Sequence, residues 1–296
     1  MGVKGTAGRS GPSAKAGRWL TPASGFLAGY SHTLNPYVGC AFGCSYCYVR
    51  RMPVALFRGE EWGSWADAKR HAPESLKREI AAAKRKGPVT IFMASATDPY
   101  QPLESTERLT RSLLAVMAEP DARPDALFVQ TRSPLVMRDA DVLARLRDAG
   151  VALLVSVTVE TDRDDIRCAL TPSAPPLAAR LRALRELRDR GLPTQAAVSP
   201  VLPCTEAFAR RLREVVDRVT IDSFAMGDGS GGKRSERLGM GEALARLGLA
   251  AWYEPEAWRP VYDSLCAEFG ADRVFVSQEG FLPPAPSRIL HTEENR

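Results

Sequence analysis

The sequence predicts an α/β fold, because short apolar segments rich in β-branched residues alternate with longer amphipathic segments along most of the chain. The short segments are almost continuously apolar, which is typical of parallel strands that are buried on both faces. Right-handed crossovers between such strands give either an open sheet or a barrel. Six strand–helix units suit a partial (β/α)6 barrel of the TIM type with a C-terminal helical extension. In such a barrel the functional residues lie on the loops that follow the strands.

The expected elements follow one another regularly. Six segments have the composition of strands: residues 33–39, 89–94, 126–131, 151–157, 193–198 and 219–224. Five segments between them have helical periodicity: residues 73–86, 105–118, 139–149, 177–190 and 206–217. Glycine, which commonly ends a helix, follows three of these segments as Gly87, Gly150 and Gly191. The arginines of segment 177–190 stand beside acidic residues, so we expect them on a solvated helix face.

These patterns divide the chain into three parts. Residues 1–17 are small and basic, and we expect them to form a disordered tail. Residues 18–226 form the barrel. Residues 227–296 begin with a glycine-rich segment, 227–232, expected to be a flexible loop, and continue as an extension packed on the barrel, with a short strand at 273–277.

No membrane partner and a cytoplasmic location are expected from the hydropathy pattern. No apolar run approaches the ~20 residues that cross a bilayer, and the N-terminal segment lacks the apolar stretch of a secretory signal. The formal net charge of +5 can attract nucleic acid or an anionic metabolite. Because the composition is rich in arginine throughout, this charge alone does not identify a partner.

Three of the six cysteines, Cys40, Cys44 and Cys47, lie close together directly after the first expected strand. Their spacing is C-x3-C-x2-C. The other three are scattered, so the pattern is not a disulfide framework and indicates a metal centre instead. A [4Fe-4S] cluster is usually held by four thiolates, one for each iron. Three neighbouring thiolates therefore leave one iron with an open coordination position, as in reactive metal sites.

The segment Gly39–Tyr48, with Tyr46 as the aromatic residue before the third cysteine, resembles the signature of the radical S-adenosylmethionine (SAM) superfamily. The resemblance implies that SAM binds the open iron of a [4Fe-4S] cluster. It also implies that one electron cleaves SAM to methionine and a 5′-deoxyadenosyl radical, which abstracts a substrate hydrogen atom. An external one-electron reductant of the flavodoxin or ferredoxin type would supply the electron. The backbone at Tyr46 would lie against the adenine.

Over residues 33–203 the chain is similar to the spore photoproduct lyase-like branch of that superfamily. The phrases that carry this resemblance each lie at or after the end of an expected strand: residues 39–48, 92–100, 130–133, 155–157, 171–173 and 198–200. The resemblance assigns Asp98 to the amino group of SAM, and Arg132 and Ser156 to its methionine carboxylate. A carboxylate suits an ammonium group, and a guanidinium and a hydroxyl suit a carboxylate.

One position departs from this resemblance. Spore photoproduct lyase has a cysteine just after its second strand that returns a hydrogen atom to the product radical, and here Ala96 stands there. We infer that this chain does not repair thymine lesions, and its substrate stays open, with a nucleic acid or nucleotide suggested by analogy. Cys168 and Cys204, after the fourth and fifth strands, are candidate hydrogen donors or ligands of a second cluster. Packed, unreactive thiols are the favoured interpretation of both.

Other interpretations predict different chemistry. A zinc site with His32 or a distant cysteine as fourth ligand would make a zinc-stabilised nucleic-acid-binding protein without catalysis, although zinc sites more often use paired C-x2-C units. An iron–sulfur electron carrier or redox sensor would more often have a fourth local cysteine. Near the expected pocket, Glu160 would bond a ribose or pair with an arginine such as Arg167. Tyr48, Tyr100 and Gln101 would flank the SAM pocket and contact the substrate or the adenine, or would only pack against neighbouring side chains.

Overall fold

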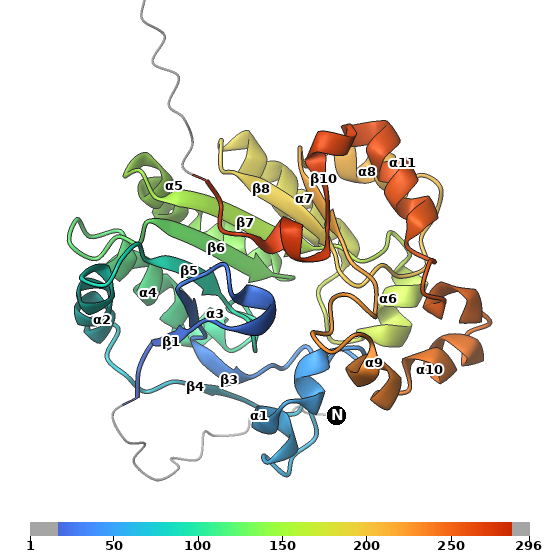
Figure 1. Ribbon diagram of the computed structural model, residues 1–296, viewed down its shortest axis with the longest axis horizontal. Helices are drawn as coiled ribbons and strands as arrows, with labels where there is room; N and C mark the ends of the chain where they lie inside the picture. Colours follow the sequence, from blue (N-terminus) through green and yellow to red (C-terminus); the bar gives the residue numbers. More distant parts are fainter. Residues whose placement is uncertain (1–16, 286–296) are drawn as a thin grey trace, which may run out of the picture.

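The computed structural model describes residues 17–285 and contains an eight-stranded sheet flanked by helices (Figure 1). The strand order is β1-β2-β5-β6-β7-β8-β9-β10. Strand β1 is antiparallel to β2, and every other neighbouring pair is parallel. The strands are β1 Leu20–Pro22, β2 His32–Leu34, β5 Thr90–Met93, β6 Ala126–Thr131, β7 Ala152–Thr158, β8 Thr194–Val198, β9 Val219–Ile221 and β10 Val274–Val276. Since β1 and β10 form the two edges of this sheet, the barrel is partial.

Five of the six expected strands appear as β5 to β9, and the expected strand at 273–277 appears as β10 beside β9. The first expected strand, 33–39, is divided instead. Its beginning is β2, and its end is β3 (Tyr37–Gly39), which pairs antiparallel with β4 (Ala66–Ala68) in a separate two-stranded sheet. Pro36 stands at the division, and proline has no N–H to donate to a continuing strand ladder.

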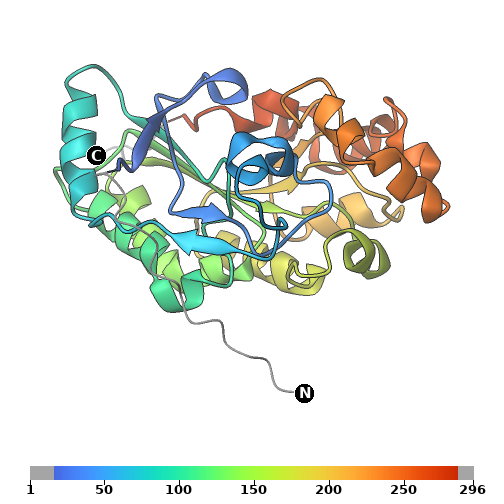
Figure 2. The same cartoon turned by 90° about the horizontal axis from the view of Figure 1, so that it is seen from below.

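The helices expected between the strands are present with shorter bounds: α2 Ser75–Lys84, α4 Leu109–Met117, α5 Ala140–Asp148, α7 Leu177–Asp189 and α8 Phe208–Arg213. The expected helix 105–118 is interrupted, because Arg108 adopts φ 52° between α3 (Glu104–Glu107) and α4. Further α-helices are α1 Pro53–Leu56, α6 Asp164–Leu170, α9 Lys233–Arg237, α10 Met240–Arg246 and α11 Arg259–Phe269. The 3-10 helices are η1 Gly25–Leu27, η2 Tyr48–Arg51, η3 Pro134–Asp139, η4 Ala250–Tyr253, η5 Ala271–Arg273 and η6 Ser277–Phe281. Figure 2 shows the green-to-yellow helices, from α4 to α7, on one face of the sheet.

Alternation along the strands gives the concave face of the sheet two chemical zones. Phe92, Phe128 and Leu154 are register partners on neighbouring strands and form an apolar cluster there. Side chains two residues further along a strand point to the same face. Those positions on β6 and β7 are Gln130 and Ser156, so the concave face becomes polar toward the carboxyl ends of the strands.

The segment after β9 is more ordered than the flexible loop expected at 227–232. The carboxylate of Asp228 accepts hydrogen bonds from the backbone N–H groups of Ser230, Gly232, Arg234 and Ser235, at 2.7 to 3.1 Å. Further along the chain, the extension contributes strand β10 to the sheet in addition to its helices. The tail expected at 1–17 lies outside the described residues apart from Gly17. None of the helices in residues 17–285 is long and apolar enough to traverse a bilayer.

Candidate active site

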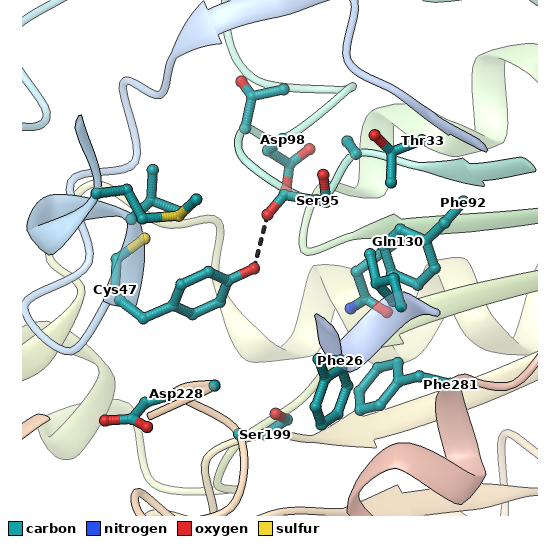
Figure 3. A pocket seen from close by; sticks show the side chains of 18 of the residues that line it. Phe26, Thr33, Cys47, Phe92, Ser95, Asp98, Gln130, Ser199, Asp228 and Phe281 are labelled. Atoms are coloured by element: carbon teal, nitrogen blue, oxygen red, sulfur yellow. Dashed lines mark hydrogen bonds between the residues drawn. The ribbon is translucent and has the colours of Figure 1, made fainter. Parts of the chain in front are cut away.

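A cavity of about 540 Å³ lies at the carboxyl ends of the parallel strands (Figure 3). Its lining comes from most of the chain, from the turn after β1 to the segment after β10. In Figure 3, Cys47 and the aromatic pair Phe26 and Phe281 lie on opposite sides of it. The cavity therefore has a cysteine end, lined by Cys40, Cys44 and Cys47, and an aromatic end, lined by Phe26, Phe92 and Phe281.

The cysteine loop begins at a position that only glycine fits. Gly39 has φ +81°, and a Cβ there would lie 2.3 Å from the ring of Trp65. Two polar side chains of the segment after β5 then hold the backbone on each side of Cys40. Gln101 accepts a hydrogen bond from the N–H of Ala41 at 2.9 Å, and Thr97 donates to the carbonyl of Gly39 at 2.5 Å. Gln101 therefore positions the loop, and it does not line the cavity.

The three thiols are free, and burial raises the pKa of the Cys44 thiol to about 12. In the part of the chain that the structure describes, no three His, Cys, Asp or Glu side chains converge as the ligands of one metal ion do. A zinc site needs such convergence, whereas each thiolate of a cluster binds a different iron. His32, the candidate fourth zinc ligand, has its Nδ1 2.8 Å from the Ser31 hydroxyl and does not line the cavity. The donor set thus fits an iron–sulfur cluster better than zinc.

Tyr46 belongs to a buried polar group that ties the cysteine loop to strands β6 and β7. Its hydroxyl donates to the carboxylate of Glu160 and also contacts Nη1 of Arg132 at 3.0 Å. Glu160 accepts from Nη1 of Arg132 at 2.6 Å and from Nη1 of Arg180 at 2.7 Å. The Tyr46 side chain is therefore an anchor of the loop, and only its backbone is left for the contact with adenine that the resemblance implies.

One carboxylate serves two guanidinium groups in this cluster, so the cluster keeps a net positive charge. Burial acts to raise the pKa of Glu160, but Arg180, Arg132 and the Tyr46 hydroxyl outweigh it and hold that pKa at about 2. The sequence analysis was wrong about Arg180, which it placed on a solvated face and which is fully buried. It also suggested Arg167 as a partner of Glu160, but Arg167 pairs with Asp164 at 2.8 Å.

Asp98 lies on the cavity wall in a fixed orientation. Its carboxylate accepts hydrogen bonds from the Thr131 hydroxyl at 2.7 Å and from the backbone N–H groups of Tyr100 and Arg132 at 2.9 Å. Burial raises the pKa of Asp98, against the effect of these donors. Each carboxylate oxygen can accept more than one hydrogen bond, so Asp98 retains capacity toward the cavity. Arg132 lines the cavity beside it.

Ser156 does not line the cavity, contrary to the role that the resemblance implies. It is fully buried, and its hydroxyl accepts a hydrogen bond from the Gln195 amide at 3.3 Å. Thr158, two residues further along β7 and on the same face, lines the cavity. On β7 the hydroxyl that lines the cavity is therefore that of Thr158, and Ser156 lies one layer deeper on the same face.

The two candidate hydrogen donors lie away from the cavity. Cys168 is exposed on α6, which replaces the loop expected there, and its sulfur lies 2.9 Å from Nη2 of Arg167. Cys204 is half-buried against the core, and burial raises its pKa to about 12. Neither side chain lines the cavity, so neither thiol reaches its contents from the observed position.

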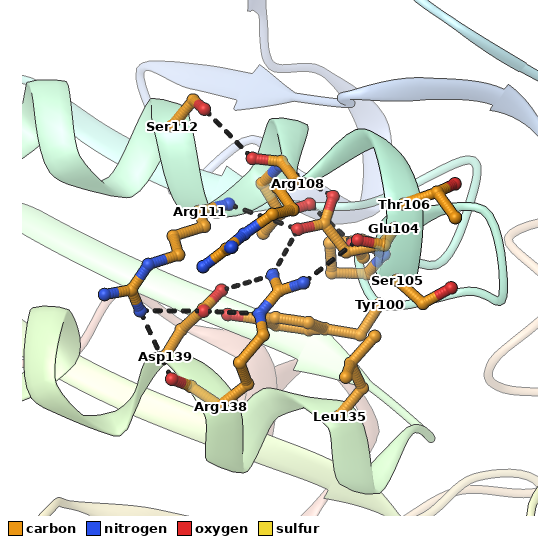
Figure 4. Close-up of polar contacts among 12 residues, drawn as sticks. Tyr100, Glu104, Ser105, Thr106, Arg108, Arg111, Ser112, Leu135, Arg138 and Asp139 are labelled. Carbon is orange, nitrogen blue, oxygen red and sulfur yellow. Dashed lines mark hydrogen bonds and ion pairs between the residues drawn. The ribbon is translucent and has the colours of Figure 1, made fainter.

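The segment that carries Asp98 is braced from behind by an ionic network (Figure 4). Glu104 accepts from the Tyr37 hydroxyl and from the guanidinium of Arg138, and it caps the backbone of Thr110 at 2.8 Å. Asp139 in turn bonds Arg138 at 2.8 Å and Arg111 at 3.0 Å. These contacts fix α3 and α4 against η3, which leads into α5, and with them the turn that follows Asp98.

Several lining residues were missed by the sequence analysis, notably Thr131, Ser199, Asp222, Asp228 and Arg234. Three of them, Thr131, Ser199 and Asp222, stand at or just after the end of a strand. Because functional residues of such barrels lie at the carboxyl ends of the strands, these three could have been predicted. One oxygen of Asp222 is buried without a hydrogen-bond partner within residues 17–285, and burial raises the pKa of this carboxyl to about 7. Gln130 likewise has an unpaired Oε1, while its amide nitrogen donates to Thr158 at 2.8 Å.

Comparisons with known proteins identify a family and similar folds. A family model described as the radical SAM superfamily matches residues 34–222. An uncharacterized protein of Methanocaldococcus jannaschii is 30% identical over 189 residues, covering 64% of this chain and 66% of that protein. One from Acidianus two-tailed virus is 31% identical over 180 residues, covering 57% and 56%. The chain thus matches less than two thirds of the length of either relative.

Among solved structures, a spore photoproduct lyase mutant has a TM-score of 0.57 and 14% identity, covering 89% of this chain and 80% of that chain. Spore photoproduct lyase complexed with dinucleoside spore photoproduct has a TM-score of 0.54 and 15% identity, covering 87% and 78%. At such identities the likeness is one of fold.

Proposed function

This chain belongs to the radical SAM superfamily of enzymes, and on that premise we propose that Cys40, Cys44 and Cys47 bind a [4Fe-4S] cluster whose open iron binds SAM. When bound, the cluster and SAM together supply a 5′-deoxyadenosyl radical that abstracts a hydrogen atom from the substrate. The observation that carries the proposal is that three free thiols line one end of a cavity that Asp98 and Arg132 also line.

Asp98 and Arg132 are suited to the two charged groups of the methionine part of SAM. We assign Asp98 to the ammonium group, because its carboxylate is held rigidly and keeps acceptor capacity toward the cavity. We assign Arg132 to the carboxylate. Its Nη1 is occupied by Glu160 and Tyr46, while Nε and Nη2 make no hydrogen bond to the described residues. On β7, Thr158 takes the place that the resemblance gives to Ser156, because of these two residues Thr158 lines the cavity.

The aromatic end of the cavity is the proposed place of the substrate. Phe26 and Phe281 lie with ring centroids 5.8 Å apart, and Phe92 lies on the same cavity wall as the unpaired amide oxygen of Gln130. Such a wall suits a flat group with a polar edge. Spore photoproduct lyase, which has a similar fold, has been solved with a dinucleoside photoproduct. By that likeness we propose a nucleotide or nucleic acid as the substrate class.

The substrate reaction differs from that of spore photoproduct lyase in this proposal. Ala96 stands where that enzyme has its hydrogen-donating cysteine, and the Ala96 N–H is bonded to the side chain of Asn35 at 2.9 Å. Ala96 does not line the cavity, and the thiols of Cys168 and Cys204 do not either. Repair of thymine lesions through a protein thiol is therefore not the function that we propose.

Anaerobic reconstitution tests the proposal. We expect about four irons per chain, and 5′-deoxyadenosine and methionine released from SAM after reduction with dithionite. Cys44→Ala should lose both the cluster and the cleavage. Cys266→Ala is the matched control, because Cys266 is a half-buried thiol on α11 outside the cavity. A protein that binds zinc alone, or binds iron without cleaving SAM, would refute the proposal.

A further inference from the structure

A group of cations lies on the surface next to the cysteine loop. Arg50 and Arg51 are on η2, and Lys233 and Arg237 are on α9. The two elements touch, and the Arg51 guanidinium donates to the carbonyl of Arg237. None of the four forms an ion pair with a carboxylate of residues 17–285. With Glu236 as the acidic residue of α9, the group keeps a net positive charge.

An apolar tip adjoins these cations on the same stretch of chain. Leu56 ends α1 and is 55% exposed, and Phe57 follows it at 87% exposed. The neighbouring Arg58 is neutralised by Glu60 and Asp67 at 2.8 Å. Exposed aromatic and apolar side chains beside arginines are typical of protein–protein interfaces, where such residues carry much of the binding energy.

This surface is close to the thiol that is least buried. Cys47 is half-buried, whereas Cys40 and Cys44 are buried. The N–H of Arg50 bonds to the carbonyl of Cys47 at 3.1 Å, so η2 begins directly at that cysteine. Three residues of chain span at most about 11 Å. An electron that arrives at Arg50 therefore has a short path to the cysteine end of the cavity.

We propose that the carrier-docking surface, made of Arg50, Arg51, Lys233, Arg237 and the tip Leu56–Phe57, binds an acidic one-electron carrier protein. This inference rests on the proposed function. In each transfer the carrier is oxidised by one electron and the cluster held by the cysteines is reduced by one. That electron is then used to cleave one S–C bond of SAM.

Nucleic acid is the other anionic partner that such cations could attract, and the arrangement favours the carrier. The four cations lie on two short turns beside an apolar tip, whereas proteins that follow a phosphate backbone combine a basic groove with stacking aromatic side chains. An electron is also required for every SAM cleaved, whatever the substrate is. A surface that receives a carrier close to the thiols is thus demanded by the chemistry itself.

The test uses the reconstituted holoenzyme and reduced flavodoxin under anaerobic conditions. Its variants are Arg50→Glu with Lys233→Glu, and separately Phe57→Ser, which changes an exposed side chain and leaves the core intact. The control is Arg145→Glu with Arg182→Glu, which changes the net charge equally on exposed positions of α5 and α7. Two quantities are measured: the dissociation constant for flavodoxin, by calorimetry at low salt, and the ratio of flavodoxin-driven to dithionite-driven SAM cleavage.

We expect the double charge reversal to raise the dissociation constant about tenfold or more and to lower the ratio similarly, with a steep salt dependence in the wild type. Phe57→Ser should act in the same direction, and the control should change either quantity less than about twofold. Unchanged affinity and ratio would overturn the proposal. So would a loss of binding to single-stranded oligothymidylate with flavodoxin affinity intact. Failure of the wild type to cleave SAM with dithionite would instead defeat the proposed function.

Discussion

Glu160→Gln is the substitution that most directly tests how the cavity is held together. The carboxylate of Glu160 joins the Tyr46 hydroxyl, Arg132 and Arg180, which come from the cysteine loop, the end of β6 and α7. Glutamine preserves the size of the side chain but removes its charge. The fully buried guanidinium of Arg180 and the half-buried one of Arg132 would then lie close together without an anion between them, which costs more than the loss of one hydrogen bond.

Two independent estimates give the magnitude. The pKa of Glu160 is lowered from 4.5 to about 2, and at 1.36 kcal/mol per pH unit the interaction of the ionised form is worth on the order of 3 kcal/mol. Breaking a buried ion pair by removing one partner typically costs about 3–5 kcal/mol. Because the pKa is depressed in the folded state, this stability is fully present above pH 4.5 and is lost as the pH falls toward 2.

Urea unfolding of the anaerobically prepared protein, followed by tryptophan fluorescence, measures the effect. At pH 7 we expect Glu160→Gln to lower the unfolding free energy by about 3 kcal/mol, and the difference to shrink below pH 4.5. Glu107→Gln is the control, since its pair with Arg70 at 3.2 Å is exposed and should be worth under about 1 kcal/mol. A loss at pH 7 no greater than that of the control would refute the bridging role of Glu160.

Three further substitutions probe separate parts of the site. Arg132→Ala should weaken SAM binding by about ten- to a hundredfold, through the loss of a charged hydrogen bond, while the iron content stays unchanged. Calorimetry and iron analysis check this, with Arg167→Ala as the control, and intact SAM affinity would contradict the assignment. The stability that Asp222 contributes should depend on pH in the opposite sense to that of Glu160, and Asp222→Asn tests this. Because burial raises the pKa of Asp222 from 3.8 to about 7, the wild type should lose stability relative to the variant as the pH rises between these values, and the difference should level off above pH 7. Urea unfolding across that range measures it, and a wild type that gains stability with pH would count against the buried carboxyl. Gly39→Ala should sharply reduce the iron bound on reconstitution. Gly39 has φ +81°, which disfavours alanine, and a Cβ there would clash with the ring of Trp65. Gly59→Ala, at φ +76° with nothing within 4 Å, should bind iron normally, and equal iron contents in the two variants would disprove the steric argument.

Local patterns in the sequence were enough to predict most strands and the metal-binding segment. Alternation of apolar and amphipathic stretches is a property of neighbouring residues, so β5 to β8 were predicted within one residue and β9 within three. The spacing of Cys40, Cys44 and Cys47 is equally local. The first strand was predicted too long because an apolar pattern continues through Pro36, although the ladder does not.

Contacts between segments that are distant in the sequence could not be predicted from such patterns. Arg180 stands among charged residues on an amphipathic helix, and only the arrival of Glu160 from β7 makes its burial favourable. The family resemblance points to Ser156, but the hydroxyl of β7 that lines the cavity is that of Thr158. Which of the two positions reaches the cavity depends on how β7 is placed against its neighbours, and the local sequence does not determine that.

The two ends of the cavity also differ in how much of their lining the family match covers. The family match covers residues 34–222, which include Cys40, Cys44, Cys47, Asp98 and Arg132. Phe26 and Phe281, at the aromatic end, lie outside this range and come from the two ends of the described chain. They are brought together partly by a hydrogen bond from the Gln278 amide to the carbonyl of Phe26 at 2.6 Å. Two of the three aromatic side chains at the proposed substrate end therefore come from outside the matched segment, whereas Phe92 lies within it.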